Sequence, residues 1–304
     1  MSVLSDHAAR YVALRAALGY QPGGTARLVR SLVDHVEAAG DDHLAVEVTV
    51  SWAHMAVSDS QVAVRLSFAR RFGAYLSALD PAHEIPPPAL RPPDSYRTPP
   101  HIYSEEEIAA LLAAAGKLSP GLWASSVATL IGLAAACGIR PAEAYRLCCC
   151  DVDLDGGRLA VMRSKGGRSR LLPLHATTTA ALTAHLKVRR RARIDHDRLF
   201  VTATGRPLTS AVFAPTFRCL LADASIVTAA GRRPARLGDL RHSFAVATLT
   251  GWHRDGIDVQ QNLPVLSAYL GHLRPASTFW YLEAVPELMA IVGQRVADAW
   301  EAGS

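Results

Sequence analysis

"CGIRPAEAYRL", residues 137–147, marks the place where a long apolar helix gives way to charged side chains. Gly138 favours the end of that helix, Arg140 follows in the turn, and Pro141 suits the first position of a new helix. Glu143 then falls in a first helical turn, where the helix dipole stabilises a carboxylate and from where it can reach Arg140. The pattern predicts either a structural Arg–Glu pair or an arginine that faces a phosphate.

The helix before this corner belongs to an uncharged stretch, residues 118–139. Pro120 opens it and Gly138 closes it, while two serines and a threonine interrupt its apolar surface. What remains is too short and too polar to cross a membrane, so we expect a buried helix at the centre of a domain. The first residues, "MSVLSDHAARYV", also lack the long apolar core of a signal peptide.

The second half of the chain alternates helical and strand patterns around this helix. Ser104 and Glu107 predict a capping box at a helix start. "GRLAVMR" and "RSRLLPLH" are short strand candidates, and "SKGG" between them is typical of a hairpin turn. Helical patterns cover residues 104–116, 120–137, 176–193, 209–224, 238–250 and 264–270, and a last amphipathic segment covers 286–300.

The first part of the chain reads as a small helical bundle, with helices over 2–20, 25–40 and 58–79. A proline-rich stretch follows, and because proline fixes φ and lacks an amide hydrogen we expect an extended connector there. The predicted organisation is a helical domain over 1–83, a linker over 84–100 and a second domain over 101–304. The expected fold class is mainly α with a small antiparallel β-sheet.

The composition limits the possible functions. Of the 304 residues, 50% are hydrophobic, enough for a packed core. The 32 basic side chains outnumber the 27 acidic ones, and the excess falls in residues 101–304, which predicts a polyanionic partner for that half. The five cysteines include no CxxC pair, so we expect buried free thiols and no metal site.

Four more residues of the second half could carry chemistry, although each has a plain structural interpretation when taken alone. Lys165 lies at the hairpin tip, where most lysines are simply solvated. Arg241, at a predicted helix start, suits a phosphate site but is also typical of a surface arginine near a cap. His272 follows a glycine that should end a helix, and Tyr281 lies in an aromatic run typical of a core.

Taken together, these residues resemble the tyrosine recombinase (phage integrase) family. The resemblance rests on "GIRPAE", "SKGG", "DLRHSFA", and "LGH" followed nine residues later by a tyrosine. Their joint order is far more specific than any one of them. The resemblance implies a SAM-like helical core-binding domain over 1–83 and a tyrosine recombinase catalytic domain over 101–304, the two gripping opposite faces of double-stranded DNA.

The resemblance also implies a role for each site residue. Tyr281 would attack a DNA phosphodiester and form a 3′-phosphotyrosyl bond, while Arg140 and Arg241 would hold the non-bridging oxygens. Lys165 would donate a proton to the departing 5′-oxygen, and His272 would hydrogen-bond or position the phosphate. The covalent bond keeps the energy needed for rejoining, so neither ATP nor another cofactor nor a metal is expected.

Further expectations follow from the same resemblance. Glu143 would support the first arginine, and the helix that carries Arg65, Arg70 and Arg71 would contact DNA in the core-binding domain. A homo-tetramer, or related recombinases, would assemble on two sites, and the final helix would dock on a neighbouring protomer or pack on its own domain. The expected location is the cytoplasm, associated with the nucleoid, and the "ASTFWYL" run favours a mobile-element enzyme.

One position departs from the family pattern. The third motif usually reads His-x-x-Arg-His, but here Gly238 stands in place of the first histidine. The missing imidazole would have faced the same phosphate as Arg241, and His242 is about 100° around the helix from that arginine. A catalytically impaired DNA-binding partner of a related recombinase is therefore one alternative. A type IB topoisomerase-like enzyme, which shares the tyrosine chemistry but relaxes supercoils without strand exchange, is another, although the linker and the helical first half argue mildly against it.

Overall fold

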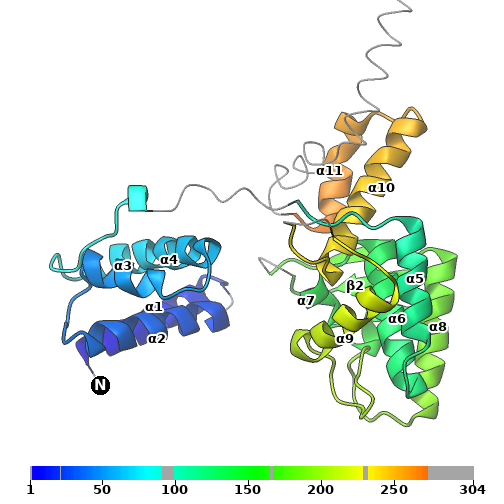
Figure 1. The fold of residues 1–304 in the computed structure, drawn as a ribbon, viewed down its shortest axis with the longest axis horizontal. Coiled ribbons are helices and arrows are strands. Elements are labelled where there is room, and N and C mark those ends of the chain that lie inside the picture. The colour runs from blue at the N-terminus through cyan, green and yellow to red at the C-terminus, as the bar shows by residue number, and fades with distance from the viewer. Residues whose placement is uncertain (1, 21, 91–98, 165–166, 229–231, 273–304) are drawn as a thin grey trace, which may run out of the picture. The chain divides into compact units, whose positions relative to one another are not determined.

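The structure, a computed structural model, consists of two compact units, Met1–Thr98 and Pro99–Ser304. It describes residues 2–20, 22–90, 99–164, 167–228 and 232–272. Figure 1 shows the elements of both units. The predicted fold class, mainly helical with one small antiparallel sheet, is confirmed.

The first unit is a helical bundle. Its elements are α1 (Val3–Ala17), α2 (Pro22–Ala38), α3 (Val46–His54), α4 (Asp59–Ser77) and a short 3-10 turn, η1 (Pro88–Leu90). Serine side chains cap α1 and α4, where Ser2 accepts from the amide of Ser5 and Ser58 from that of Gln61. Aromatic rings fill the core between the helices, with the Tyr11 and Phe72 centroids 5.1 Å apart.

Helix α3 is the one α-helix in the described part of this unit that the sequence did not predict, and the short turn η1 replaces part of the expected extended connector. Its sequence, "VEVTVSWAH", is rich in β-branched residues, which have modest helix propensity, and its N-cap Ala45 makes no side-chain cap. Trp52 and Ala53 are buried in the bundle core, so tertiary packing stabilises a helix that lacks local signals.

The start of the proline-rich segment packs on the first unit. Arg70 donates from Nε to the carbonyl of Pro86 (2.9 Å) and from Nη2 to that of Pro87 (3.1 Å). Glu84 accepts from the amide of Val46 at 2.6 Å. Proline has no amide donor, but its carbonyl is a good acceptor, and these carbonyls hold the segment against α4.

The second unit is built around one buried helix. Its helices are α5 (Glu105–Gly116), α6 (Gly121–Cys137), α7 (Pro141–Ala144), α8 (Ala176–Arg191), α9 (Ser210–Asp223), α10 (Leu240–Arg254) and α11 (Val259–Leu270), with 3-10 turns η2 (Cys149–Asp151) and η3 (Leu237–Asp239). The predicted capping box of Ser104 and Glu107 opens α5. Helix α6 packs against α5, α8 and α10, which confirms the expected central helix. No helix in the described part of the chain is long and apolar enough to cross a membrane.

The sheet has three short antiparallel strands in the order β1 (Val152–Asp153), β2 (Arg158–Val161) and β3 (Arg170–Pro173). The β2–β3 pair is the predicted hairpin, and in its register Leu159 faces Leu172, both fully buried. Side chains alternate across a strand, so Arg170 lies on the same face of β3 as Leu172.

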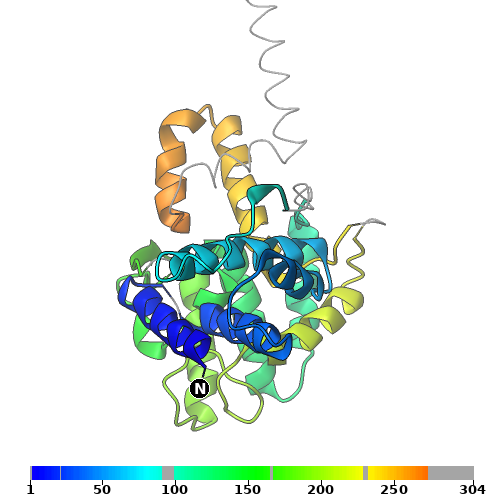
Figure 2. The same ribbon diagram turned by 90° about the vertical axis from the view of Figure 1, so that its left-hand side faces the viewer.

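Helices α10 and α11 run side by side at one end of the second unit, as Figure 2 shows. They share a separate apolar cluster that includes Leu249, Leu263 and Leu266. Helix α11 begins at Val259, five residues before the predicted start, so Pro264 lies inside it. Asp258 caps this first turn by accepting from the amide of Gln261, a start signal that the proline obscured.

Candidate active site

The corner between α6 and α7 is fixed by backbone geometry. Gly138 ends α6 with φ of +57°, and a Cβ there would lie 2.6 Å from Cδ1 of Phe244, so only glycine fits. Arg140 is the N-cap of α7, and Glu143 at its third position accepts from the Arg140 amide at 3.1 Å. The predicted pairing of these two residues is present.

Glu143 is the centre of a buried charge network, with 3% of its surface exposed. One oxygen, Oε1, accepts from Nη1 of Arg140 at 2.8 Å and from Nη1 of Arg170 at 3.1 Å, while Oε2 accepts from Nη2 of Arg170 at 2.8 Å. The hydroxyl of Ser164 donates to Oε1 as well. Burial alone would raise the pKa of Glu143, but the hydrogen bonds from Arg170, Ser164 and Arg140 outweigh it and lower the pKa to about 2.

Arg170 and Ser164 were not among the predicted site residues. Arg170 begins β3 and its side chain is 12% exposed. The available signal was strand alternation, because Arg170 shares a face with the core residue Leu172 and a charged group on a buried face needs a partner. The sequence could indicate that need, but the identity of the partner depends on how the hairpin meets α7.

Arg241 lies near the start of α10 and is 6% exposed, so its interpretation as a surface arginine is wrong. Its Nη1 donates to the carbonyl of Gly138 at 2.7 Å and its Nη2 to that of Leu270 at 2.6 Å. The arginine therefore bridges the C-terminal ends of α6 and α11.

A separate ion pair, between Arg233 and Asp239, fixes the turn before Arg241. Asp239, buried at the end of η3, receives two hydrogen bonds from Arg233, at 2.8 and 2.6 Å. It also accepts from the amide of Arg236 at 2.9 Å. A carboxylate with a planar guanidinium and a backbone amide is held in one orientation, which fixes where α10 begins.

Three arginines converge on the C-terminal end of α11. Arg170, Arg241 and Arg140 donate to the successive carbonyls of Tyr269 (2.9 Å), Leu270 (2.6 Å) and Gly271 (2.7 Å). The last carbonyls of a helix have no partner within the helix and form the negative end of its dipole, so cations suit them. Three separate segments thus place their guanidinium groups around one helix end.

His272 immediately follows this helix end. Gly271 ends α11 with φ of +67°, and the amide of His272 donates to the carbonyl of Ser267 at 2.9 Å. Burial, followed by the charges of Arg241 and Arg140, lowers the pKa of His272 to about 4. The imidazole is therefore neutral at physiological pH and sits within a strongly positive region.

The described residues thus bring together Arg140, Glu143, Arg241 and His272 from the predicted set. The other two predicted catalytic residues, Lys165 and Tyr281, lie outside the described residues. The pattern-breaking residue Gly238 lies beside the site, where an added Cβ would be 3.6 Å from Cγ of Pro141, an ordinary contact.

The three predicted DNA-contacting arginines all lie on α4 of the first unit, in different settings. Arg65 donates to the carbonyl of Trp52 at 2.6 Å and lies over the Trp52 ring. Arg70 holds the proline-rich segment as described above, and Arg71 is exposed. All five cysteines are free; Cys137 is buried, but Cys150 and Cys219 are exposed, so the expectation of uniformly buried thiols is wrong for these two.

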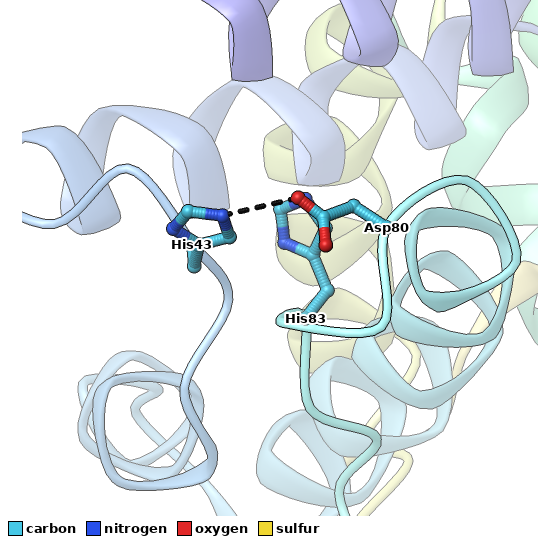
Figure 3. A group of neighbouring side chains, drawn as sticks. All are labelled: His43, Asp80 and His83. Atoms are coloured by element: carbon cyan, nitrogen blue, oxygen red, sulfur yellow. Dashed lines mark hydrogen bonds and ion pairs between the residues drawn. The ribbon is translucent and has the colours of Figure 1, made fainter.

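A separate cluster of titratable side chains lies in the first unit (Figure 3). His43, Asp80 and His83 form the one group in the described part of the chain with metal-ligand chemistry, with their ligand atoms within 4.8 Å of one another. Nε2 of His43 lies 3.2 Å from Oδ2 of Asp80, and its Nδ1 lies 2.5 Å from Oδ1 of Asp42.

The hydrogen bonds of this cluster do not fit a metal ion. The amide of Leu44 donates to Nδ1 of His83 at 3.0 Å, so a neutral His83 ring carries its proton on Nε2 and has no lone pair left for a metal. Hydrogen bonds to Asp42 and Asp80 raise the pKa of His43, which favours its protonated form. The cluster therefore joins the loop before α3 to the loop after α4 through hydrogen bonds.

This cluster predicts a pH dependence of stability. Burial, followed by the charge of His43, lowers the pKa of His83 below 6.5, and His7 acts in the same direction against the opposing effects of Asp80 and Asp42. As pH falls below about 6.5 the unfolded chain binds a proton that folded His83 resists, so the free energy of unfolding decreases.

His83→Asn keeps an acceptor for the Leu44 amide but cannot be protonated. Urea unfolding at about pH 7.5 and pH 5.5 should show a smaller acid loss for this variant than for the wild type. His54→Asn, at an exposed histidine of α3, is the matched control and should behave like the wild type. The raised pKa of His43 acts with the opposite sign, because its contribution is lost as pH rises. An acid loss in His83→Asn as large as that of the wild type would contradict this assignment.

Gly271 provides a second test of the geometry. A Cβ there would lie 3.0 Å from Nη1 of Arg170 and 3.4 Å from Nη1 of Arg140, on a backbone that L-residues rarely adopt. We expect Gly271→Ala to lower the free energy of unfolding by about 1–2 kcal/mol, as measured by urea denaturation. Gly132→Ala is the matched control, since its Cβ would contact only Leu112 at 3.8 Å within α6 and should be neutral or stabilising. Equal stability of both variants would show that the helix end is not tightly held.

The amino-acid sequence is similar to those of known integrases and recombinases. The phage integrase family model matches residues 102–288. The putative integrase/recombinase y4rB of Sinorhizobium fredii (strain NBRC 101917 / NGR234) is 35% identical over 315 residues, covering 99% of each chain. Tyrosine recombinase XerD of Caulobacter vibrioides is 30% identical over 246 residues, covering 78% of this chain and 75% of its own.

Solved structures share the fold at lower identity. The Tn1549 transposon integrase in complex with transposon right end DNA has a TM-score of 0.65 at 16% identity, covering 98% of this chain and 100% of its own. The XerH site-specific recombinase bound to a palindromic difH substrate has a TM-score of 0.64 at 18% identity, covering 91% and 78%. With a family match over most of the second unit and a relative aligned along nearly its whole length, the chain belongs to the phage integrase family of tyrosine recombinases.

Proposed function

We propose that the chain is a site-specific DNA recombinase that cleaves and rejoins double-stranded DNA through a covalent 3′-phosphotyrosyl bond to Tyr281. The observation that carries the proposal is the convergence of Arg140 and Arg241 on one helix end, directly before His272. Two guanidinium groups and a neutral imidazole in one partly buried place suit a single phosphate. Family membership supplies the reaction class.

In the proposed cleavage step the Tyr281 phenol releases its proton to water as its oxygen attacks phosphorus, and the bond from phosphorus to the 5′-oxygen breaks. Lys165 supplies a proton to that leaving oxygen, so that an alcohol departs instead of an alkoxide. Arg140 and Arg241 contact the non-bridging oxygens, whose negative charge grows in the pentacoordinate transition state. Because the phosphotyrosyl bond replaces the phosphodiester bond, the reverse step rejoins the strand without ATP.

His272 has a defined role in this scheme. Its pKa of about 4 means that the ring is neutral at physiological pH and would reach the phosphate as a hydrogen-bonding group, not as a third cation. A bound phosphate would partly offset the surrounding positive charges and raise that pKa. Glu143 acts through Arg140, whose Nη1 it holds.

The wider DNA contacts and the assembly are also part of the proposal. The Tn1549 transposon integrase was solved in complex with transposon right end DNA, and the XerH site-specific recombinase was solved bound to a palindromic difH substrate, which supports double-stranded DNA as the ligand here. In the first unit Arg71 is exposed on α4 and is the readiest of the three predicted contacts, since Arg65 and Arg70 already donate to backbone carbonyls. We propose a tetramer on two sites, encoded by a mobile element.

A second candidate function rests on Gly238. The glycine removes one phosphate-facing side chain from the family pattern, and such a loss typically costs orders of magnitude in rate. The packing does not require glycine, because a Cβ at 238 would make only ordinary contacts with Pro141. The chain could then act as a DNA-binding partner of a related recombinase, and Gly238→His restores the family histidine at a position where the packing admits a Cβ.

Covalent trapping tests both candidates. The full chain is incubated with nicked suicide duplexes tiled across the DNA that flanks its gene, and denaturing gels are used to detect a protein–DNA adduct. We expect an adduct with the wild type, none with Tyr281→Phe, and an adduct with the matched control Tyr269→Phe. An adduct with Gly238→His alone would indicate a disabled site. No adduct with either protein would favour the DNA-binding partner.

Binding should weaken steeply with salt, because phosphate contacts release counterions. The logarithm of the binding constant should fall linearly with the logarithm of salt concentration, with a slope of about −0.9 for each phosphate contacted. Arg71→Gln should make this slope shallower by about one contact. Fluorescence anisotropy on a labelled duplex measures both effects, and a flat salt response would rule out DNA as the ligand.

A further inference from the structure

Arg170 is the third guanidinium group of the candidate site and has no place in the proposed reaction so far. It extends from the first residue of β3 and reaches two other segments. Its Nη1 and Nη2 donate to Oε1 and Oε2 of Glu143, at 3.1 and 2.8 Å, and its Nε donates to the carbonyl of Tyr269 at 2.9 Å. With these contacts the planar group is held on two sides, so it is rigidly placed.

The contacts of Arg170 determine how Glu143 and Arg140 hydrogen-bond to each other. Arg170 forms a two-point fork with the carboxylate, whereas the guanidinium group of Arg140 donates only to Oε1, through its Nη1. A carboxylate that is 3% exposed needs strong donors. Without Arg170, the two-point fork with Arg140 becomes the best remaining arrangement, and it would turn Arg140 toward Glu143 and away from a phosphate.

Charge leads to the same conclusion. Arg170 offsets the negative charge of Glu143, so the positive charges of Arg140 and Arg241 remain available to a phosphate. Arg170 also keeps the C-terminal end of α11 in place through Tyr269. Arg140 and Arg241 hold the next two carbonyls of that helix end, and they can exchange those contacts for phosphate oxygens while Arg170 keeps its own.

We infer that Arg170 is a positioning residue for DNA cleavage: it occupies the Glu143 carboxylate so that Arg140 stays directed at the scissile phosphate. This inference rests on the proposed function. It assigns Arg170 no contact with DNA and no part in bond breaking. Its effect should therefore fall on the cleavage rate of bound DNA and leave the affinity for DNA nearly unchanged.

The test uses the full chain and the suicide duplex that gives the wild-type adduct. Arg170→Gln is compared with Arg158→Gln. Arg158 is the matched arginine on the neighbouring strand β2; it is exposed, and its Nε lies 3.6 Å from Oδ2 of Asp153. Three quantities are measured for each protein: the single-turnover rate of adduct formation with excess protein, the Kd for an intact duplex, and the Tm. Rates are compared per folded molecule, well below the lowest Tm.

We expect Arg170→Gln to slow adduct formation at least tenfold while the Kd changes less than about threefold, and Arg158→Gln to match the wild type. The double variant Glu143→Gln with Arg170→Gln should regain part of the rate, because a neutral amide no longer draws Arg140 away. Arg170→Lys should form the adduct more slowly than the wild type, since an ammonium group cannot form the two-point fork with Glu143. If Arg170 had a purely structural role, Arg170→Gln would lower the Tm but would not slow adduct formation by the folded molecules.

Two results would overturn the inference alone: a wild-type rate for folded Arg170→Gln, or no recovery in the double variant. A wild-type chain that forms no adduct on any duplex would instead overturn the proposed function, and this inference with it. The two failures are therefore separated by the wild-type lane of the same gel.

Discussion

A single buried carboxylate holds the second unit's charged centre together. Glu143 is ionised and nearly inaccessible to water, so it must be surrounded by donors. Those donors come from its own helix start, from Ser164 before the hairpin tip and from Arg170 after it. Because one carboxylate satisfies all of them, the corner between α6 and α7 and the two arms of the hairpin are fixed relative to one another.

Charged groups also surround the C-terminal end of α11. Its last carbonyls attract the three guanidinium groups that surround the helix end, and each guanidinium donates to one of them. A phosphate is a stronger partner for a guanidinium than a carbonyl is, so the arrangement is suited to exchange. In the proposed reaction the cost of gathering like charges is met during folding, and the transition state then finds them in place.

Local signals in the sequence were enough for much of this. The apolar run that ends in Gly138 predicted α6, Pro141 and Glu143 predicted the next helix start, and strand patterns on either side of a glycine turn predicted the hairpin. Helix α3 and the role of Arg170 were not predicted, because packing and long-range pairing decide them. The assignments of Lys165 and Tyr281 depend on the family pattern and stay predictions.

In the proposed reaction Arg140 and Arg241 share one scissile phosphate. The most direct test is a crystal structure of the Tyr281→Phe chain bound to an uncut duplex that carries its site. We expect one backbone phosphate with its non-bridging oxygens within about 3.2 Å of both guanidinium groups, while Arg170 remains on Glu143. Bound DNA whose nearest phosphates lie beyond the reach of these arginines, with both still on their helix-end carbonyls, would contradict it.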